Sequence, residues 1–150
     1  MRLDPLCDAI LQYEGEGVWL KPYGEAEAAG FGAGVGSMKG TRLSGKLAWA
    51  NHPRRREDGV WCPDVHGSVA TVDGAQLLFE MRGYSVLEKV KGEMRAITAV
   101  FLFQASDPRY KWLNTTVAPA EGEIDEEAGR VTLRVFACVN EAAPGPPAAD

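Results

Sequence analysis

The fold is decided by the stretch HGSVATVDGAQLLFEMRGY, residues 66–84, which predicts two strands joined by a turn. Asp73-Gly74 is a strong signal for a hairpin turn between two such strands. The side chains after the turn alternate in polarity, and residues two apart in a strand point to the same side. One face of the second strand carries Leu77, Phe79 and Met81. The other face carries Gln76, Leu78, Glu80, Arg82 and Tyr84.

Further segments between turn signals extend this pattern along the chain. They cover residues 6–13, 25–36, 43–51, 96–104 and 131–139. In the segment 43–51, Leu47, Trp49 and Asn51 share one face. Residues 86–96 are expected to form a short helix or a charged loop. Many short strands at even spacing are typical of a sandwich or a barrel, and we favour a barrel because no strand looks protected as an edge.

We therefore expect an all-β protein with a single antiparallel β-barrel domain over residues 1–140. The length of 150 residues suits one domain, since domains usually have about 100–150 residues. Residues 141–150 are rich in proline and alanine and cannot bury enough apolar surface to offset the entropy of ordering. They are expected to form a disordered tail.

The composition argues against several classes of protein. The chain has 16 basic and 21 acidic residues, and its net charge of −5 argues against nucleic-acid binding, which usually needs a clustered basic surface. Its three cysteines cannot form a full disulfide framework. No stretch approaches the roughly 20 apolar residues that span a membrane. Residues 1–5 carry no apolar signal core, so we expect a cytoplasmic protein.

The densest polar cluster, residues 51–66, holds both histidines of the chain. It lies between two expected strands, where a rigid scaffold can present a functional loop. Four potential metal ligands occur in it, but their spacing matches no tight metal-binding motif, so no metal is expected. These residues are His52, Cys62, Asp64 and His66. The simpler interpretation is an imidazole that is hydrogen-bonded at the rim of the barrel.

The polar face of residues 76–84 is the second candidate site. If it lines a closed cavity, Glu80 is a candidate general base or acid, and Arg82 can stabilise a developing enolate or carboxylate. If it faces solvent, the same two side chains form a weak surface salt bridge. The functional hypothesis depends on the first arrangement, in which the polar face surrounds a bound ligand.

A glycine-rich run, residues 30–36, does not fit the dinucleotide-binding pattern. No third glycine falls at the required position, and no βαβ unit follows. Alternating glycines in a strand instead mark a bend or the close approach of another backbone or a ligand.

Several motifs, taken in order, resemble one bacterial family. They are Leu3–Leu6, Gly40–Leu47, Asp58–Val60, Thr71–Ala75, Arg82–Gly83 and Asp107–Asn114. Their order and spacing resemble domain-of-unknown-function family 3237, which is also called uncharacterised protein family 0311.

The resemblance implies a small antiparallel β-barrel similar to the calycin and allene-oxide-cyclase barrels, and it implies no established activity. It also implies a set of cavity or loop positions. These are Arg42, Asp58, Asp73, Arg82, Trp112 and Asn114. An alternative for Trp112 and Asn114 is that they plug one end of the barrel.

The leading hypothesis is a cofactor-free enzyme that transfers a proton on a hydrophobic or aromatic carbonyl or carboxylate compound, as an isomerase, cyclase, lyase or hydratase does. The expected catalytic residues are Arg82, Glu80, His52, Asp64 and His66. The expected ligand-binding residues are Trp49, Asn51, Trp61 and Tyr84, together with Arg42, Asp73, Trp112 and Asn114 from the resemblance. Two alternatives stay open: a non-catalytic barrel that binds a hydrophobic small molecule, and a self-associating barrel, such as a homodimer, without a ligand.

Overall fold

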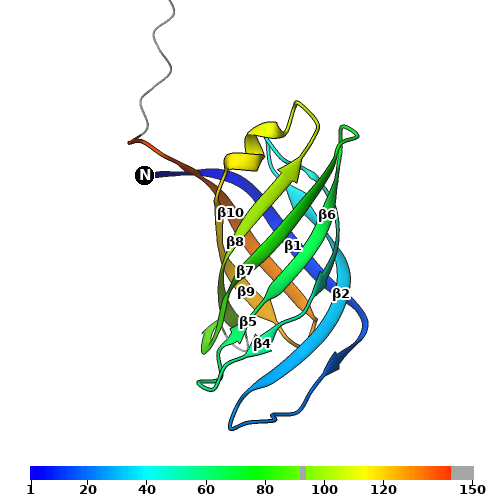
Figure 1. Cartoon of the computed structure of the whole chain (residues 1–150), viewed down its shortest axis with the longest axis vertical. Coiled ribbons are helices and arrows are strands. Elements are labelled where there is room, and N and C mark those ends of the chain that lie inside the picture. Colours follow the sequence, from blue (N-terminus) through cyan, green and yellow to red (C-terminus); the bar gives the residue numbers. More distant parts are fainter. Residues whose placement is uncertain (92–93, 143–150) are drawn as a thin grey trace, which may run out of the picture.

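The computed structural model describes residues 1–91 and 94–142 and consists almost entirely of β-strands (Figure 1). Within these residues it has ten strands and one short 3₁₀-helix. The strands are β1 (Arg2–Trp19), β2 (Ala28–Lys39), β3 (Gly45–Asn51), β4 (Arg54–Arg55), β5 (Trp61–Cys62), β6 (Asp64–Thr71), β7 (Gln76–Lys91), β8 (Met94–Ala105), β9 (Ala118–Asp125) and β10 (Arg130–Val139). The helix η1 (Lys111–Thr115) lies between β8 and β9. The all-β class expected from the sequence is confirmed.

Eight of the described strands close into one antiparallel barrel. Their order around the barrel is β1-β10-β9-β8-β7-β6-β3-β2, and β2 pairs in turn with β1. The short strands β4 and β5 form a hairpin that bridges β2 and β7 at one end. The expected barrel is therefore confirmed, and its closure leaves no free sheet edge among these eight strands.

The hairpin expected from residues 66–84 joins β6 and β7 through residues 72–75, and a turn of three residues, 72–74, lies between the hydrogen-bonded Thr71 and Ala75. Ala70 pairs with Gln76, and the backbone N–H of Thr71 donates to the carbonyl of Ala75. Gly74 has a φ of 90°, in the left-handed region that the last residue of such a loop occupies. The Asp73-Gly74 signal thus correctly predicts the hairpin.

Two expectations about less regular segments have different outcomes. A helix or charged loop over residues 86–96 is wrong, because β7 extends to Lys91 and β8 begins at Met94. The disordered tail expected over residues 141–150 lies, from residue 143 onward, outside the described residues. In the described part of the chain, no helix is long and apolar enough to cross a membrane.

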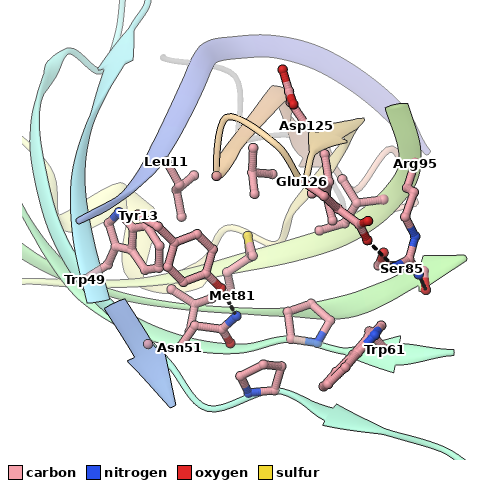
Figure 2. Close-up of a pocket in the computed structure, with 18 of the residues that line it drawn as sticks. Leu11, Tyr13, Trp49, Asn51, Trp61, Met81, Ser85, Arg95, Asp125 and Glu126 are labelled. Carbon is pink, nitrogen blue, oxygen red and sulfur yellow. Dashed lines mark hydrogen bonds and ion pairs between the residues drawn. The ribbon is translucent and has the colours of Figure 1, made fainter. Parts of the chain in front are cut away.

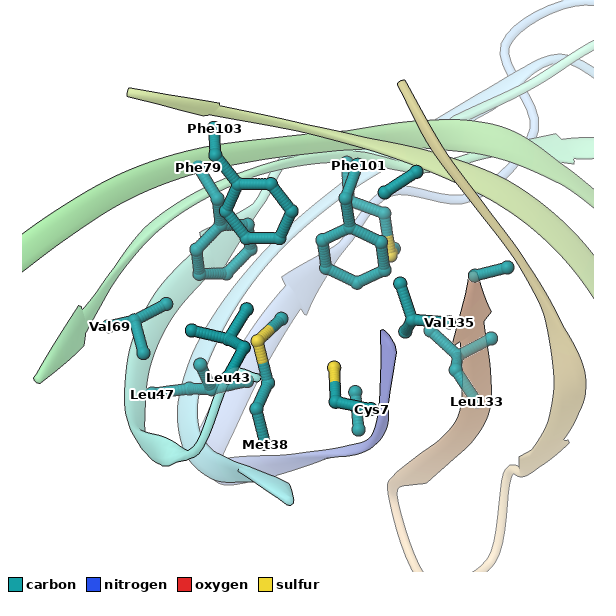
Figure 3. Close-up of a cluster of buried hydrophobic side chains, with 14 of the residues drawn as sticks. Cys7, Met38, Leu43, Leu47, Val69, Phe79, Phe101, Phe103, Leu133 and Val135 are labelled. Carbon is teal, nitrogen blue, oxygen red and sulfur yellow. The ribbon is translucent and has the colours of Figure 1, made fainter. Parts of the chain in front are cut away.

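Apolar side chains fill the half of the barrel next to η1 (Figure 3). Phe79, Phe101 and Phe103 pack together there, with ring centroids between 5.6 and 6.5 Å apart. Leu113 of η1 is fully buried, so the helix covers this end of the barrel. The apolar contacts in this filled half are closely packed and stabilise the fold.

The orientation of β7 is the reverse of the one on which the functional hypothesis depends. Leu77, Phe79 and Met81 point into the barrel and are at most 4% exposed. Glu80 is half-buried and Arg82 is exposed, both on the outer face. The reason is that burial of apolar surface drives folding, and the apolar face of β7 packs against the inward rows of the other strands.

A candidate ligand pocket at the open end of the barrel

The other half of the barrel contains a pocket with a volume of about 400 Å³ (Figure 2). Small-molecule sites usually enclose about 300–1,000 Å³, so this volume suits a small ligand. The floor of the pocket is apolar and is formed by inward-facing positions of five strands. These positions are Leu11, Val65, Met81, Ile97 and Val131.

Aromatic rings form one wall of the pocket and part of its rim. The Tyr13 ring lies edge-on to Trp49 at a centroid distance of 4.7 Å and to Trp19 at 6.0 Å. The indole N–H of Trp49 donates to the carbonyl of Val35 at 2.9 Å, which fixes this ring. Trp61 of β5 lies edge-on to Trp19 at 6.1 Å. Such contacts are favourable, so the rings hold one another in place around the pocket.

Alternate glycines in β2 make room for this aromatic wall. A Cβ atom on Gly30 would lie 2.1 Å from the Trp19 ring. A Cβ atom on Gly32 would lie 2.7 Å from the Tyr13 ring. Both distances are too short for real contacts, so only glycine fits beneath these rings. Residues 30–36 were predicted to mark a bend or the approach of a backbone or a ligand, and at Gly30 and Gly32 the groups that approach closely are aromatic side chains of the pocket.

A chain of hydrogen bonds fixes the Tyr13 hydroxyl in the pocket. The backbone N–H of Asp64 donates to Asn51 Oδ1 at 3.0 Å, so this side-chain oxygen is the acceptor. Asn51 Nδ2 therefore faces Tyr13 and donates to its Oη at 2.7 Å. Because the phenolic oxygen accepts this bond, its own proton is available to a molecule in the pocket.

The surroundings of Tyr13 favour its neutral form. Burial raises the pKa of Tyr13, because a phenolate is poorly solvated in an apolar pocket. The hydrogen bond from Asn51 acts in the opposite direction and is the smaller of the two effects. The pocket therefore presents a protonated hydroxyl that can donate a hydrogen bond.

A charged group lies on the opposite side of the pocket from Tyr13 (Figure 2). Arg95 of β8 is 8% exposed, and its Nη1 lies 2.5 Å from Glu126 Oε1. Its Nε donates to the carbonyl of Val86 at 3.1 Å. Ser85 of β7 lines the same side, and its side chain is buried. The pocket thus has a neutral donor on one side and a cation on the other, with an apolar floor between them.

Three of the expected ligand-binding residues line this pocket. Trp49 and Asn51 lie on the inward face of β3, as the alternation of residues 43–51 predicts. Trp61 lies near the opening, with the Arg55 guanidinium 5.4 Å from the centre of its ring. Tyr84 is instead exposed on the outer face of β7.

Four of the expected catalytic residues lie together, but on the outer face of β6 and β7. His66 Nε2 lies 3.0 Å from Asp64 Oδ1, and Arg82 Nε lies 3.5 Å from the same oxygen. Glu80 is the cross-strand partner of His66. The His66 and Arg82 side chains are 60% and 62% exposed, so Arg82 and Asp64 form a surface ion pair and His66 and Asp64 a surface hydrogen bond, both of small energy. His52, the fifth expected residue, is also exposed.

The potential metal ligands of residues 51–66 do not converge. Within the described residues, no group of three or more histidine, cysteine, aspartate and glutamate side chains is placed to hold a metal ion. The groups that the pocket offers to a ligand are therefore a phenol, an amide, a hydroxyl, a guanidinium and carboxylates.

The ligand-binding positions implied by the family resemblance lie at the closed end of the barrel. The Arg42 guanidinium lies 3.9 Å from the centre of the Trp112 ring. The Asn114 side chain exchanges two hydrogen bonds with the backbone of Ala105, at 2.7 and 2.8 Å. Asp73 lies in the β6–β7 loop at the same end. Within the described chain these residues fasten the closed end, which agrees with the alternative that Trp112 and Asn114 plug it.

Five polar residues of the pocket are not among the candidates predicted from the sequence. They are Tyr13, Ser85, Arg95, Asp125 and Glu126. Tyr13 follows Leu11 in the inward row of β1, so the same alternation rule could have found it. Arg95 was excluded because the expected strand began one residue later, at Ala96. Glu126 lies in the turn between β9 and β10, where no alternation exists to place it.

A closed eight-stranded antiparallel barrel with a pocket at one end defines the chain as a small β-barrel protein of the kind that can hold one small ligand. The family model described as "Protein of unknown function (DUF3237)" matches residues 21–138, and the chain belongs to this family. The resemblance seen in the sequence motifs is thereby confirmed. A comparison with the curated proteins gives no match.

Solved structures from other organisms have the same fold. A beta-barrel like protein from Acinetobacter baumannii aligns with a TM-score of 0.80 and 20% identity over 91% of this chain and 94% of that chain. A protein of unknown function from Clostridium acetobutylicum aligns with a TM-score of 0.81 and 14% identity over 93% and 100%. A protein described as an enzyme from Penicillium herquei aligns with a TM-score of 0.68 and 20% identity over 90% and 93%. At these identities the likeness shows the fold alone.

Proposed function

We propose that the open-end pocket binds a hydrophobic or aromatic carbonyl or carboxylate compound and that the protein catalyses a proton transfer on it without a cofactor. The observation that carries the proposal is the Tyr13–Asn51 pair in an otherwise apolar wall. A few convergent polar groups in an apolar pocket are the usual arrangement of a small-molecule site. A structural neighbour described as an enzyme is compatible with catalysis on this fold.

Tyr13 is suited to act on a carbonyl oxygen. Its hydroxyl is held by Asn51, and its proton is not used in that bond. When a C–H bond next to a carbonyl breaks, negative charge develops on the carbonyl oxygen, and a fixed donor in an apolar site stabilises this charge. The proton that leaves carbon passes to water or to a carboxylate of the pocket, Asp125 or Glu126. The Tyr13 proton stays on its phenolic oxygen and is shared in a hydrogen bond with the carbonyl oxygen, so the product of this step is a hydrogen-bonded enolate.

The aromatic wall is suited to the body of such a compound. Trp49, Trp19 and Trp61 all line the pocket, and their rings offer apolar surface to a flat ligand. The floor is also apolar. The ligand that matches these surfaces is therefore hydrophobic or aromatic, with one polar group directed to Tyr13.

The experiment measures deuterium incorporation into α-tetralone in heavy water by mass spectrometry. We expect the wild-type protein to accelerate exchange at the carbon next to the carbonyl. Tyr13→Phe removes the donor and should lower this acceleration about 10²–10³-fold, the usual effect of losing one such group. Tyr23→Phe is the matched control, because Tyr23 is 65% exposed and should leave the rate unchanged.

Binding of the same compound, followed by tryptophan fluorescence, separates two functions. Binding without exchange would contradict catalysis and would identify a non-catalytic binding barrel, which the apolar floor also suits. Absence of both binding and exchange for a panel of aromatic ketones, enones and acids would contradict the proposal altogether.

A further inference from the structure

The pocket contains a buried cation, the guanidinium of Arg95, although most of the other residues that line it are apolar. Arg95 continues the inward row of β8, which otherwise carries apolar residues such as Ile97 and Phe101. Its side chain is 10% exposed. Removing a guanidinium from water is costly unless an anion accompanies it. Among the described residues, the carboxylate that accompanies Arg95 is that of Glu126.

Arg95 and Glu126 differ in how they are held. Arg95 is a strand residue with further bonds from Nε to the Val86 carbonyl and, at 3.5 Å, from Nη2 to the Ser85 carbonyl. Glu126 lies in the turn between β9 and β10, and its side chain is 55% exposed. The cation therefore belongs to the pocket wall, while its counterion reaches in from the rim and can turn out to solvent.

A second observation points to a ligand at the same place. The Ser85 hydroxyl is buried, lines the pocket and has no hydrogen-bond partner among the described residues. A buried hydroxyl without a partner is unfavourable, so such groups usually meet an acceptor or donor. Ser85 lies beside Arg95, on the side of the pocket opposite Tyr13 (Figure 2).

We propose that this side of the pocket binds the carboxylate of a hydrophobic acid, which replaces Glu126 on Arg95 and accepts a hydrogen bond from Ser85 Oγ. The exchange keeps the buried charge balanced, because one carboxylate replaces another on the guanidinium. The body of the acid then lies across the apolar floor toward Tyr13. This inference rests on the proposed function. It adds that the ligand is negatively charged and that Glu126 competes with it for Arg95.

The test compares a matched acid and amide, naphthoate and naphthamide, by isothermal titration calorimetry. In Glu126→Gln the competing carboxylate is gone, so the affinity for naphthoate should rise about tenfold relative to naphthamide, as expected for one hydrogen bond to a charged group. Ser85→Ala should weaken naphthoate more than naphthamide. Arg95→Met should abolish the preference for the acid.

Glu121→Gln is the matched control, because it removes the same charge from an exposed pair with Arg134 on the outside of the barrel. It should leave both affinities unchanged. Circular dichroism verifies that each variant is folded, and Glu126→Gln with Ser85→Ala carries the test if Arg95→Met does not fold.

Three results separate the inference from the proposed function. A selective gain for naphthoate in Glu126→Gln supports the inference. Equal binding of acid and amide, with a ratio that Glu126→Gln does not change, overturns the inference and leaves the proposed function standing. Failure of both compounds to bind wild type and Glu126→Gln overturns the proposed function and the inference with it.

Discussion

The two halves of the barrel are built from the same eight strands but have different interiors. Next to η1, the space is filled by Phe79, Phe101 and Phe103 (Figure 3). At the other end, the same strands surround a pocket with Tyr13 and Arg95 on opposite sides (Figure 2). Tight packing and the pocket are therefore separated along the length of the strands, and most of the strands take part in both.

Single strands show this division most clearly. On β6, Val69 is fully buried in the filled half, while Val65, four residues away on the same face, lines the pocket. On β8, the inward row passes from Phe103 and Phe101 to Arg95. A strand therefore contributes to the packed interior at one end and lines the pocket at the other, and substitutions in the two halves should have different consequences.

The largest expected effect is on stability, from Phe101→Ala. Phe101 is fully buried and its ring lies against two other phenylalanine rings. Its removal should lower the free energy of unfolding by about 3–5 kcal/mol, because a cavity is left in a closely packed region. Urea denaturation measures this loss.

Trp61→Ala is the comparison for the open half, because this side chain is larger but only partly buried at the rim. It should cost about 1 kcal/mol, the middle of the range for single substitutions. A similar loss in the two variants would show that the halves do not differ in packing.

An enlargement should show the same contrast between the two halves as a truncation, with the larger loss of stability in the filled half. Val69→Phe adds volume to a filled interior and should lower the free energy of unfolding by about 1–3 kcal/mol. Val65→Phe puts the added ring into the pocket, so it should cost much less and should prevent binding of α-tetralone. Denaturation and fluorescence titration of the two variants provide the measurement. Equal destabilisation, with binding retained in Val65→Phe, would contradict the presence of usable space beside Val65.

The sequence predicts the fold well because alternation and turn chemistry are local. The Asp73-Gly74 signal and the apolar row from Leu77 to Met81 suffice to place the β6–β7 hairpin. Trp49 and Asn51 were placed correctly by the same rule. The even spacing of the strands indicates a sandwich or a barrel, and the preference for a barrel depends on the lack of a strand that looks protected as an edge.

The site was harder to predict because a two-residue alternation separates two faces without saying which holds a ligand. The chemistry of Glu80 and Arg82 makes them candidates, but the apolar face of β7 is the one that points inward. The polar groups of the pocket, such as Tyr13 and Arg95, are single polar residues in inward rows that are otherwise apolar. The pairing of Tyr13 with Asn51 joins residues 38 positions apart, and no local pattern predicts such a contact.

The smallest expected effect is on the titration of a single pocket group, Tyr13. An ordinary tyrosine has a pKa of about 10, and burial raises the pKa of Tyr13 above its usual value. The phenolate absorbance of Tyr13 at alkaline pH, taken as the difference between wild type and Tyr13→Phe, should therefore appear at a higher pH than is usual for tyrosine. Asn51→Ala removes the hydrogen bond that favours phenolate, so it should raise the pKa of Tyr13 further.

The raised pKa of Tyr13 also determines how the stability of the protein changes with pH. Because the folded state holds this proton more tightly than the unfolded state, its contribution to stability is complete below the unfolded pKa and is lost as pH rises through the folded one. Stability of wild type should thus fall more steeply above about pH 10 than that of Tyr13→Phe. Equal slopes, or an early phenolate signal from Tyr13, would mean that its hydroxyl lies in water. Tyr13 would then be as accessible to water as a residue on the outer surface of the barrel, and the pocket would not be a distinct environment at this position.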